Sequence, residues 1–411
     1  MESAAGSPLT EAGVPVSGTG SRVVDRFSLV EGGPIYRFQV AIHMAMPDRS
    51  GVARRAFLTA FLTWFPLLVL ALIQDRAFGH QVKIPFLYDF AANVRFLAGL
   101  PLLVIAEAAI DPRLNHAVRH FVKSGLVTAE NMPAFEDAIL RVNRLRDSLL
   151  PALIIVIAAF APSIWYSETE LLKGGVSTWH TIISPSGESL SLAGWWFGLI
   201  SLPLYRVLLF RWVWMTCLWA LFLRRITRID LGCVATHPDK AGGFGFLAEE
   251  EILFGFIALA TSVVLAGALG NAIAYEGATV SSLKFLIIAF CVLAVVVFAA
   301  PLLVLTPKLL KVKRAGMYGY SGLGTEYSRA FDAKWIQGRS LEREPLLGAS
   351  DIQSLADLSN SFSVVREMRV VLVDRKVLAG LAIPAILPLI PLMIIATPTD
   401  QLVRAVLKLL V

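Results

Sequence analysis

Long uninterrupted apolar blocks constrain this sequence more than any other feature. A helix needs about 20 mostly apolar residues to cross the core of a bilayer. Seven blocks approach or exceed that length, at 56–73, 86–110, 149–165, 192–223, 252–275, 286–305 and 377–396. Backbone groups in lipid must be hydrogen-bonded within the protein, so blocks of this length predict helices. We predict an all-α fold, a polytopic transmembrane helix bundle with about seven spans.

The composition agrees with this class. Hydrophobic residues make up 56% of the chain and charged residues 17%, whereas a soluble domain has about 25% charged residues. These values exclude a disordered chain, a disulfide scaffold and an ordinary cytosolic enzyme. The three cysteines, Cys217, Cys233 and Cys291, lack metal-ligand spacing. We predict no metal site, no cofactor and no nucleic-acid partner.

Basic residues are distributed unequally between the segments that join the blocks. With the N-terminus inside and 192–223 as one crossing, the inside segments hold 28 of the 37 Lys and Arg residues. Such an excess marks the cytoplasmic side, so the C-terminus is expected outside. The alternative is two half-spans broken at Pro203. It would place the basic run 224–228 outside, and we therefore favour a single crossing.

The chain is expected to have five parts. They are a flexible cytosolic tail at 1–21, a membrane domain at 22–306, a cytosolic helical loop at 307–376, the seventh span at 377–396 and an interfacial helix at 397–411. Within the loop, Ser350 and Gln353 fit a capping box. The apolar residues behind it step by three and four, which predicts an amphipathic helix. Its apolar stripe must cover another helix, the membrane surface or a partner chain, and packing within the protein is the simplest of these.

Charged residues inside the spans are the first candidates for function, because a charge at mid-bilayer costs at least about 2.5 kcal/mol. The polar candidates for a substrate or ion pathway are Asp89, Arg95, Glu107, Arg206, Arg211 and Asn271. Asp89 and Arg95 are expected to meet Arg206. Glu107 is expected below Arg211, which we place near the middle of the membrane. Three arginines facing two carboxylates leave one positive charge, which would attract an anion. The alternative is an ion-paired core that binds no ligand.

The most motif-like stretch is HPDKAGGFGF at 237–246, before the fifth span. Pro238 stops a helix, and Gly242 and Gly243 permit tight turns, so we predict a structural turn. The other interpretation makes His237 and Asp239 metal ligands or an acid and a base. Two residues do not make a metal site, and no third ligand is evident.

Several stretches of the chain resemble an uncharacterised family of bacterial polytopic inner-membrane proteins that carry an HPDxAGGxGFL cytosolic loop. The resemblance rests on TWFPLLVLALI at 63–73, RFLAGLPLLVIAE at 95–107, HPDKAGGFGFL at 237–247, FDAKWIQG from Phe331 and DIQSLADL from Asp351, with VREMR ending at Arg369. It covers the chain from about Arg37 onward. It implies the bacterial cell inner membrane as the location and supplies no mechanism.

Three functions remain open from the sequence. The first is passive or ion-coupled passage of a small solute or ion through a polar interior between spans two and four, since no ATP-binding loop is present. The alternative is a membrane scaffold or sensor whose cytosolic helices bind a protein partner or a second copy of the chain. The third is a membrane enzyme that uses His237 and Asp239.

Overall fold

The computed structural model describes residues 20–42, 51–79, 81–169, 178–184, 187–338 and 350–395. The predicted C-terminal helix at 397–411 and nearly all of the predicted tail lie outside these ranges. Within them the structure is helical apart from one antiparallel hairpin of β1 (Thr181–Ser184) and β2 (Gly187–Leu190). The prediction of an all-α fold is confirmed.

The helices follow one another along the chain in an order that matches the apolar blocks. The first group is α1 (Gly20–Asp25), α2 (Gly33–Ala41), α3 (Val52–Ile73), α4 (Phe90–Val94), α5 (Leu100–Lys123), α6 (Met132–Asp147) and α7 (Leu149–Thr169). The second is α8 (Leu192–Trp196), α9 (Leu202–Ile226), α10 (Phe246–Glu251), α11 (Gly255–Tyr275), α12 (Val280–Leu303), α13 (Thr306–Phe331), α14 (Ser350–Glu367), α15 (Arg375–Ile386) and α16 (Ile390–Ile395).

Six helical stretches are long and apolar enough to cross a membrane. They are Val52–Ile73, Phe90–Lys123, Leu192–Ile226, Phe246–Tyr275, Val280–Leu303 and Arg375–Ile394. A seventh crossing is present if α6 and α7, which meet at a bend of 42°, count as one span. The chain is therefore a polytopic membrane protein with six or seven candidate spans among the described residues.

The long block at 192–223 lies in one continuous helix. A π turn at Phe197–Ser201 joins α8 to α9, and Pro203 follows it in the first turn of α9. A proline at this position does not break the helix, because the wider turn before it already interrupts the regular hydrogen-bond pattern.

The second and fourth spans share one arrangement. Each begins at a residue whose side chain caps a five-residue helix, Asp89 in one and Ser191 in the other. A five-residue π turn and then a Leu-Pro pair follow in both, and the Leu-Pro pairs begin at Leu100 and Leu202. Every matching feature is 102 positions apart in the chain. The two spans are thus parallel copies of one local design and flank α3 at the same level.

Large exposed apolar side chains mark the belt that faces lipid. On α3, α7 and α12 they include Phe57, Phe61, Leu153, Ile157, Leu286 and Val292. On α5 the last of them is Ile105, and on α9 it is Val213. Past these two residues α5 and α9 are covered by α1 and α6. On α7, which packs against α9, exposed apolar side chains continue to Leu149 and Leu150. The depth predicted for Arg211, near the middle of the membrane, stays a prediction.

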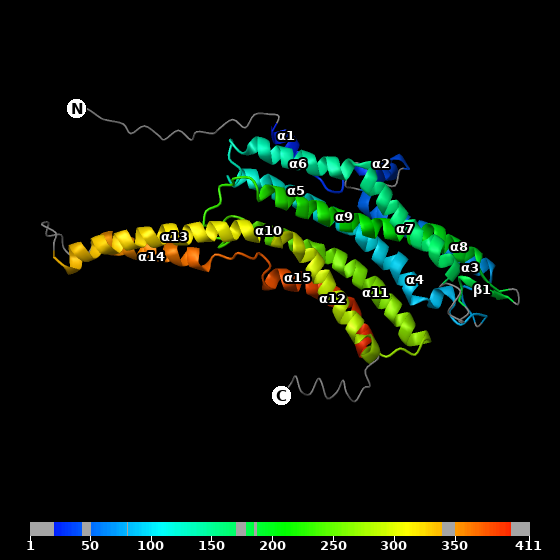
Figure 1. Ribbon diagram of the computed structural model, residues 1–411. Helices are drawn as coiled ribbons and strands as arrows, with labels where there is room; N and C mark the ends of the chain where they lie inside the picture. Colours follow the sequence, from blue (N-terminus) through cyan, green and yellow to red (C-terminus); the bar gives the residue numbers. More distant parts are fainter. Residues whose placement is uncertain are drawn as a thin grey trace, which may run out of the picture.

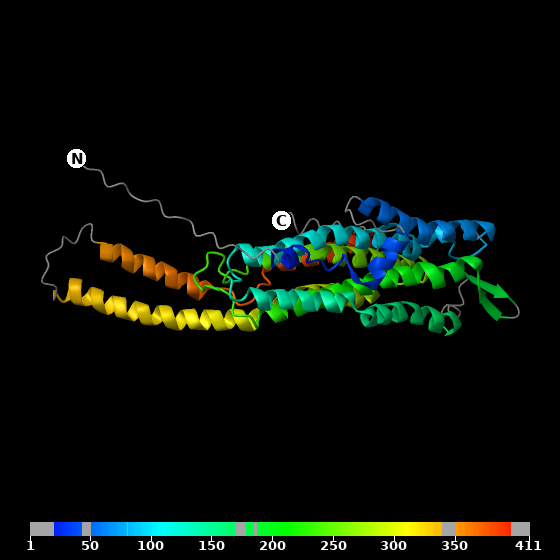
Figure 2. The ribbon, with the colours of Figure 1, turned by 90° about the horizontal axis from the view of Figure 1, so that it is seen from above.

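The helices form one elongated bundle (Figure 1). We call the end that carries β1 and β2 the hairpin end and the opposite end the arm end. Figure 2 shows α13 and α14 side by side, extending beyond the arm end, and we call this pair the arm. The stripe predicted on α14 packs within the chain at its base, where Val365 and Met368 are buried.

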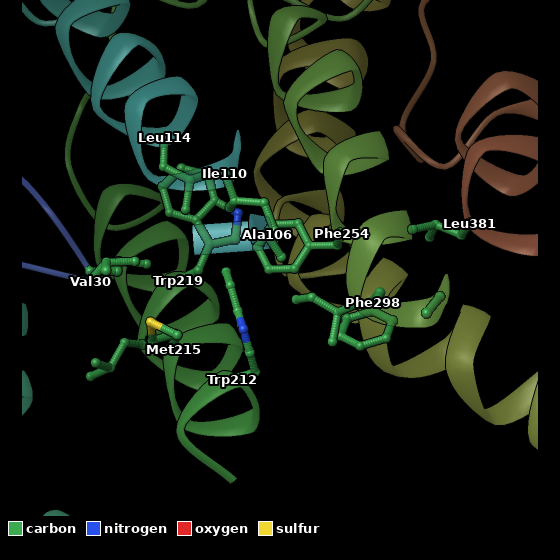
Figure 3. Close-up of a cluster of buried hydrophobic side chains, with 14 of the residues drawn as sticks. Val30, Ala106, Ile110, Leu114, Trp212, Met215, Trp219, Phe254, Phe298 and Leu381 are labelled. Atoms are coloured by element: carbon green, nitrogen blue, oxygen red, sulfur yellow. The ribbon is translucent and has the colours of Figure 1, made fainter. Parts of the chain in front are cut away.

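The buried apolar core lies where the helices of the two halves of the chain meet (Figure 3). Side chains of α5 and α9, among them Ile110 and Trp219, meet Phe254 and, from α12, Phe298. The polar groups described next lie beside this core.

Candidate functional site

The central feature is a buried ionic cluster contributed by three helices. Glu107 of α5 accepts a hydrogen bond from Arg211 Nη1 of α9 at 2.7 Å through Oε1, and its Oε2 accepts one from Arg55 Nη2 of α3. All three residues are buried, and the Glu107 side chain is only 3% exposed. Glu107 and Arg211 come together as the sequence predicts. Arg55 was missed because it directly precedes the first apolar block, where a basic residue is read as a topology signal.

The segment between α1 and α2 enters the bundle beside this cluster. Arg211 Nη2 donates to the carbonyl oxygen of Val30 at 2.7 Å. The carboxylate of Asp111 accepts from the Ser28 hydroxyl at 2.8 and 2.9 Å and from the backbone amide of Leu29 at 2.9 Å. Figure 3 shows Val30 at the edge of the buried apolar cluster. Residues 27–33, the N-terminal insert, thus bring irregular backbone into the bundle, which is tolerated because its polar groups are hydrogen-bonded there.

Little space remains at the ionic cluster. A cavity of about 30 Å³ lies between the N-terminal insert and α9 and is lined in part by Gly32, Arg146 and Arg211. This volume accommodates one or two water molecules. Two arginines share the Glu107 carboxylate, and each of them donates to a different oxygen of it. The geometry is that of the ion-paired alternative, a core held together by its own charges.

The charged residues of the hairpin end do not pair as predicted. Asp89 caps α4 by accepting from the amide of Ala92, and it also accepts from Trp179 Nε1 at 2.7 Å and Asn271 Nδ2 at 2.8 Å. Capping directs its carboxylate back to the first turn of α4. Arg206 instead faces α7 and donates to the Ser163 hydroxyl at 2.8 Å.

Arg95 has a third environment. Its guanidinium lies 5.8 Å from the centre of the Tyr205 ring, a cation–π geometry between the second and fourth spans. The expected group of three arginines around two carboxylates is therefore divided, since Arg211 pairs with Glu107 whereas Arg95 and Arg206 lie at other places in the bundle. Asn271 acts as a bridge: its Nδ2 donates to Asp89 and its Oδ1 accepts from the amide of Phe90 at 2.9 Å.

The glycine-rich loop is a turn organised by one carboxylate. Asp239 accepts from the amides of Ala241 at 2.7 Å, Gly243 at 3.2 Å and Gly245 at 2.8 Å. Gly242 and Gly243 have φ angles of +66° and +95°, which side chains with a Cβ rarely adopt. This geometry agrees with the predicted structural turn.

The same carboxylate contacts His237. Its Oδ1 lies 2.8 Å from His237 Nδ1. Partial burial acts to raise the pKa of Asp239, but the hydrogen bonds from Gly245, Ala241 and Gly243 and the contact with His237 outweigh it and lower that pKa. Among the described residues no group of three His, Cys, Asp or Glu side chains is placed to hold a metal.

The loop is fastened to the segment that follows α14. The Arg369 amide donates to the Lys240 carbonyl oxygen at 2.6 Å, and Arg369 Nη2 donates to the Asp239 carbonyl oxygen at 3.3 Å. Lys240 Nζ pairs with Glu367 at 2.5 Å. The HPDKAGG and VREMR stretches therefore form one joint at the base of the arm. Nothing in the sequence links them, since they are about 130 positions apart.

A buried carboxyl was also missed. Glu251 is fully buried, and its Oε2 accepts from Trp219 Nε1 at 3.0 Å. Its Oε1 has no hydrogen-bond partner among the described residues. In the sequence it stands in a run of three glutamates at a helix start, where exposure is the ordinary expectation.

The stretches that carry the family resemblance thus have packing roles here. The 95–107 run includes the π turn and Glu107, and the 237–247 loop forms the joint with Arg369. Comparison with models of protein families, with curated proteins and with solved structures finds no match for this chain.

Proposed function

We propose that this protein is a membrane scaffold whose arm binds a helix of a partner protein. The observation that carries the proposal is an uncovered face on α13. With 26 residues at 1.5 Å each, α13 is about 40 Å long, and most of it lies beyond the bundle (Figure 1).

The two sides of α13 differ in their surroundings. Tyr320, Tyr327 and Phe331 are half-buried, and the Tyr327 hydroxyl donates to the Asp351 carbonyl oxygen of α14 at 3.1 Å. The side turned away from these residues, which we call the outer face, includes Ala315, Tyr318, Gly319 and Gly322, and Leu323 lies at its edge. No other described element covers it.

The outer face has the properties of a helix-packing surface. Tyr318 is 81% exposed and Leu323 is 50% exposed, so both leave apolar area in water. A Cβ added at Gly319 or Gly322 would meet no atom within 4 Å. A second helix can therefore approach the backbone closely between the two large side chains. Lys311 and Glu326 flank the face with opposite charges, which would fix the direction of the partner helix.

Lipid is a poor occupant of this face, because the arm extends beyond the end of the bundle (Figure 2), whereas the exposed apolar belt lies on helices of the bundle such as α3, α7 and α12. The bundle itself supports the role of a scaffold, since its buried charges hold the helices to one another and to the N-terminal insert.

Solute or ion passage stays a prediction. It would be supported by a flux that Arg211→Leu abolishes in a folded, inserted protein.

The experiment places a photo-crosslinking amino acid at Tyr318 of the full chain in cells of its natural host. We expect an adduct with a second polypeptide. Gly322→Leu should remove it by filling the gap for the partner helix. Ser321→Leu, exposed on another side of the same turn, should leave it in place. The same probe at Tyr320 should react only within the chain.

The outcomes are decisive in both directions. An adduct that depends on Gly322 in this way, followed by direct binding of the purified partner, supports the proposal. The absence of an adduct, equal effects of the two leucine variants, or an adduct only with a second copy of the chain would contradict it.

We further propose, on the basic residues and the resemblance, that the bilayer is a bacterial inner membrane with the arm in the cytoplasm.

A further inference from the structure

A basic cavity lies at the base of the arm, between the end of α9 and the start of α13. It is an open pocket on the surface, with a volume of about 460 Å³ and several exposed lining residues. It is lined by Thr227, Arg228, Ile229, Asp230, Pro307, Lys308 and Lys311. Three of these side chains are cations and one is a carboxylate, and the cations come from segments about 80 positions apart in the chain.

Two of the cations have no counter-charge of their own. Arg228 and Lys311 make no side-chain hydrogen bond or ion pair with the part of the chain that the structure describes. Lys308 donates to the Ile229 carbonyl oxygen at 2.9 Å, and its Nζ lies 3.9 Å from Asp230, whose side chain is fully exposed. The cavity thus keeps an uncompensated positive charge next to a lysine that is fixed in place.

The backbone around the cavity leaves the charge of the site to its side chains. α13 begins here, but α12 ends at Leu303, with two residues between the two helices, so the opposite ends of the two helix dipoles largely offset each other. At the end of α9 the amides of Thr227, Arg228 and Ile229 bond the carbonyl oxygens of the last turn at 3.0 to 3.1 Å. Those carbonyl groups therefore present less unsatisfied negative charge to the cavity.

We propose that this cavity binds a phosphate group, carried either by the headgroup of an anionic lipid or by a soluble phosphorylated molecule. The cavity lies just past the point where α12 leaves the belt, since Leu303 is still half-exposed there. Basic pockets between membrane helices on the cytoplasmic side recognise such headgroups. The proposal does not depend on a partner for the arm.

The test uses the purified full chain in nanodiscs. One set contains phosphatidylcholine alone, and the other also contains cardiolipin. Inorganic phosphate and glycerol phosphate are titrated separately into the first set. The readouts are ligand retention in native mass spectrometry and the midpoint of thermal unfolding.

The matched variants each remove two positive charges, one from the end of α9 or the turn after it and one from the first half of α13. Arg228→Gln with Lys311→Gln alters the cavity, whereas Arg224→Gln with Arg314→Gln removes exposed charges that do not line it. Lys308 is left unchanged because it also holds the α9 end. We expect the cavity variant to bind about tenfold more weakly or worse, and the control to change far less.

The pattern of binding identifies the source of the phosphate. Retention of cardiolipin that depends on the cavity assigns a lipid headgroup, and saturable binding of the soluble phosphates with the same dependence assigns a soluble ligand. Equal losses in the two variants, or binding of neither class by the unaltered protein, would overturn the proposal.

Discussion

At the scale of single residues, Glu107 holds the most demanding position in the bundle. It is the acceptor for both Arg55 and Arg211, so Glu107→Gln leaves two buried guanidinium groups without a carboxylate. Breaking a buried pair costs about 3–5 kcal/mol. Arg211→Leu should cost less, about 1–3 kcal/mol, because Glu107 keeps Arg55 and only the Val30 carbonyl loses its donor. Denaturant unfolding in detergent would measure both, with Glu130→Gln on the surface as the control. A Glu107→Gln protein as stable as that control would contradict the pairing.

The glycine-rich turn gives a second prediction at this scale. Gly243 has a φ of +95°, and a Cβ there would lie 2.9 Å from a methyl group of Leu126. Gly243→Val should therefore destabilise the protein by roughly 1–3 kcal/mol. His237→Ala should be nearly silent, because its side chain is half-exposed and only touches Asp239. Thermal melting compares the two, and a stable Gly243→Val would remove the turn from the determinants of the fold.

Asp239 adds a dependence on pH. Its lowered pKa means that the folded state binds this proton less readily than the unfolded state. The stabilisation is therefore complete above the unfolded pKa, close to the ordinary 3.8, and is lost as the pH falls through the lower folded value. Asp239→Asn should lose stability at neutral pH and flatten the acid limb of the stability curve. If the variant loses stability at low pH in the same way as the unaltered protein, other carboxylates are responsible for that loss.

At the scale of elements, the N-terminal insert depends on α5 for its position. The Asp111 carboxylate accepts from the Ser28 hydroxyl and from the amides of Leu29 and Val30. Asp111→Ala should leave those donors without an acceptor, so the insert should exchange its amide hydrogens and be cut by proteases faster. Hydrogen exchange of residues 27–33 is the measurement, and the β1–β2 hairpin, far from the substitution, is the internal control. Asn115 Nδ2 also donates to the Phe27 carbonyl oxygen at 2.6 Å, so equal protection in both proteins would show that Arg211 and Asn115 suffice to hold the insert.

At the scale of the whole molecule, the bundle must place its two ends on opposite sides of the membrane. The test replaces Cys217, Cys233 and Cys291 and adds one cysteine at an exposed site, Phe78 at the hairpin end or Tyr318 on the arm. In spheroplasts, a membrane-impermeant maleimide should label Phe78→Cys and should reach Tyr318→Cys only after lysis. The reverse pattern would invert the predicted orientation, and labelling of both before lysis would contradict the span count.

The apolar blocks by themselves determined the class of the protein and the approximate limits of its spans. Length and hydropathy are local properties, and a membrane accepts almost no alternative to a helix. The turn at Gly242 and Gly243 was equally readable, since few residues tolerate positive φ. The pairing of Glu107 with Arg211 followed from their depth along two long helices.

The tertiary structure alone decided which charges meet. Asp89 turned to its own helix and to Trp179, and Arg206 turned to α7, because the rotation of each helix about its axis is set by packing with its neighbours. Arg55 joined Glu107 because the start of α3 packs against α5. The N-terminal insert and the joint between Lys240 and Arg369 bring together residues distant in the chain, and no local pattern encodes such contacts.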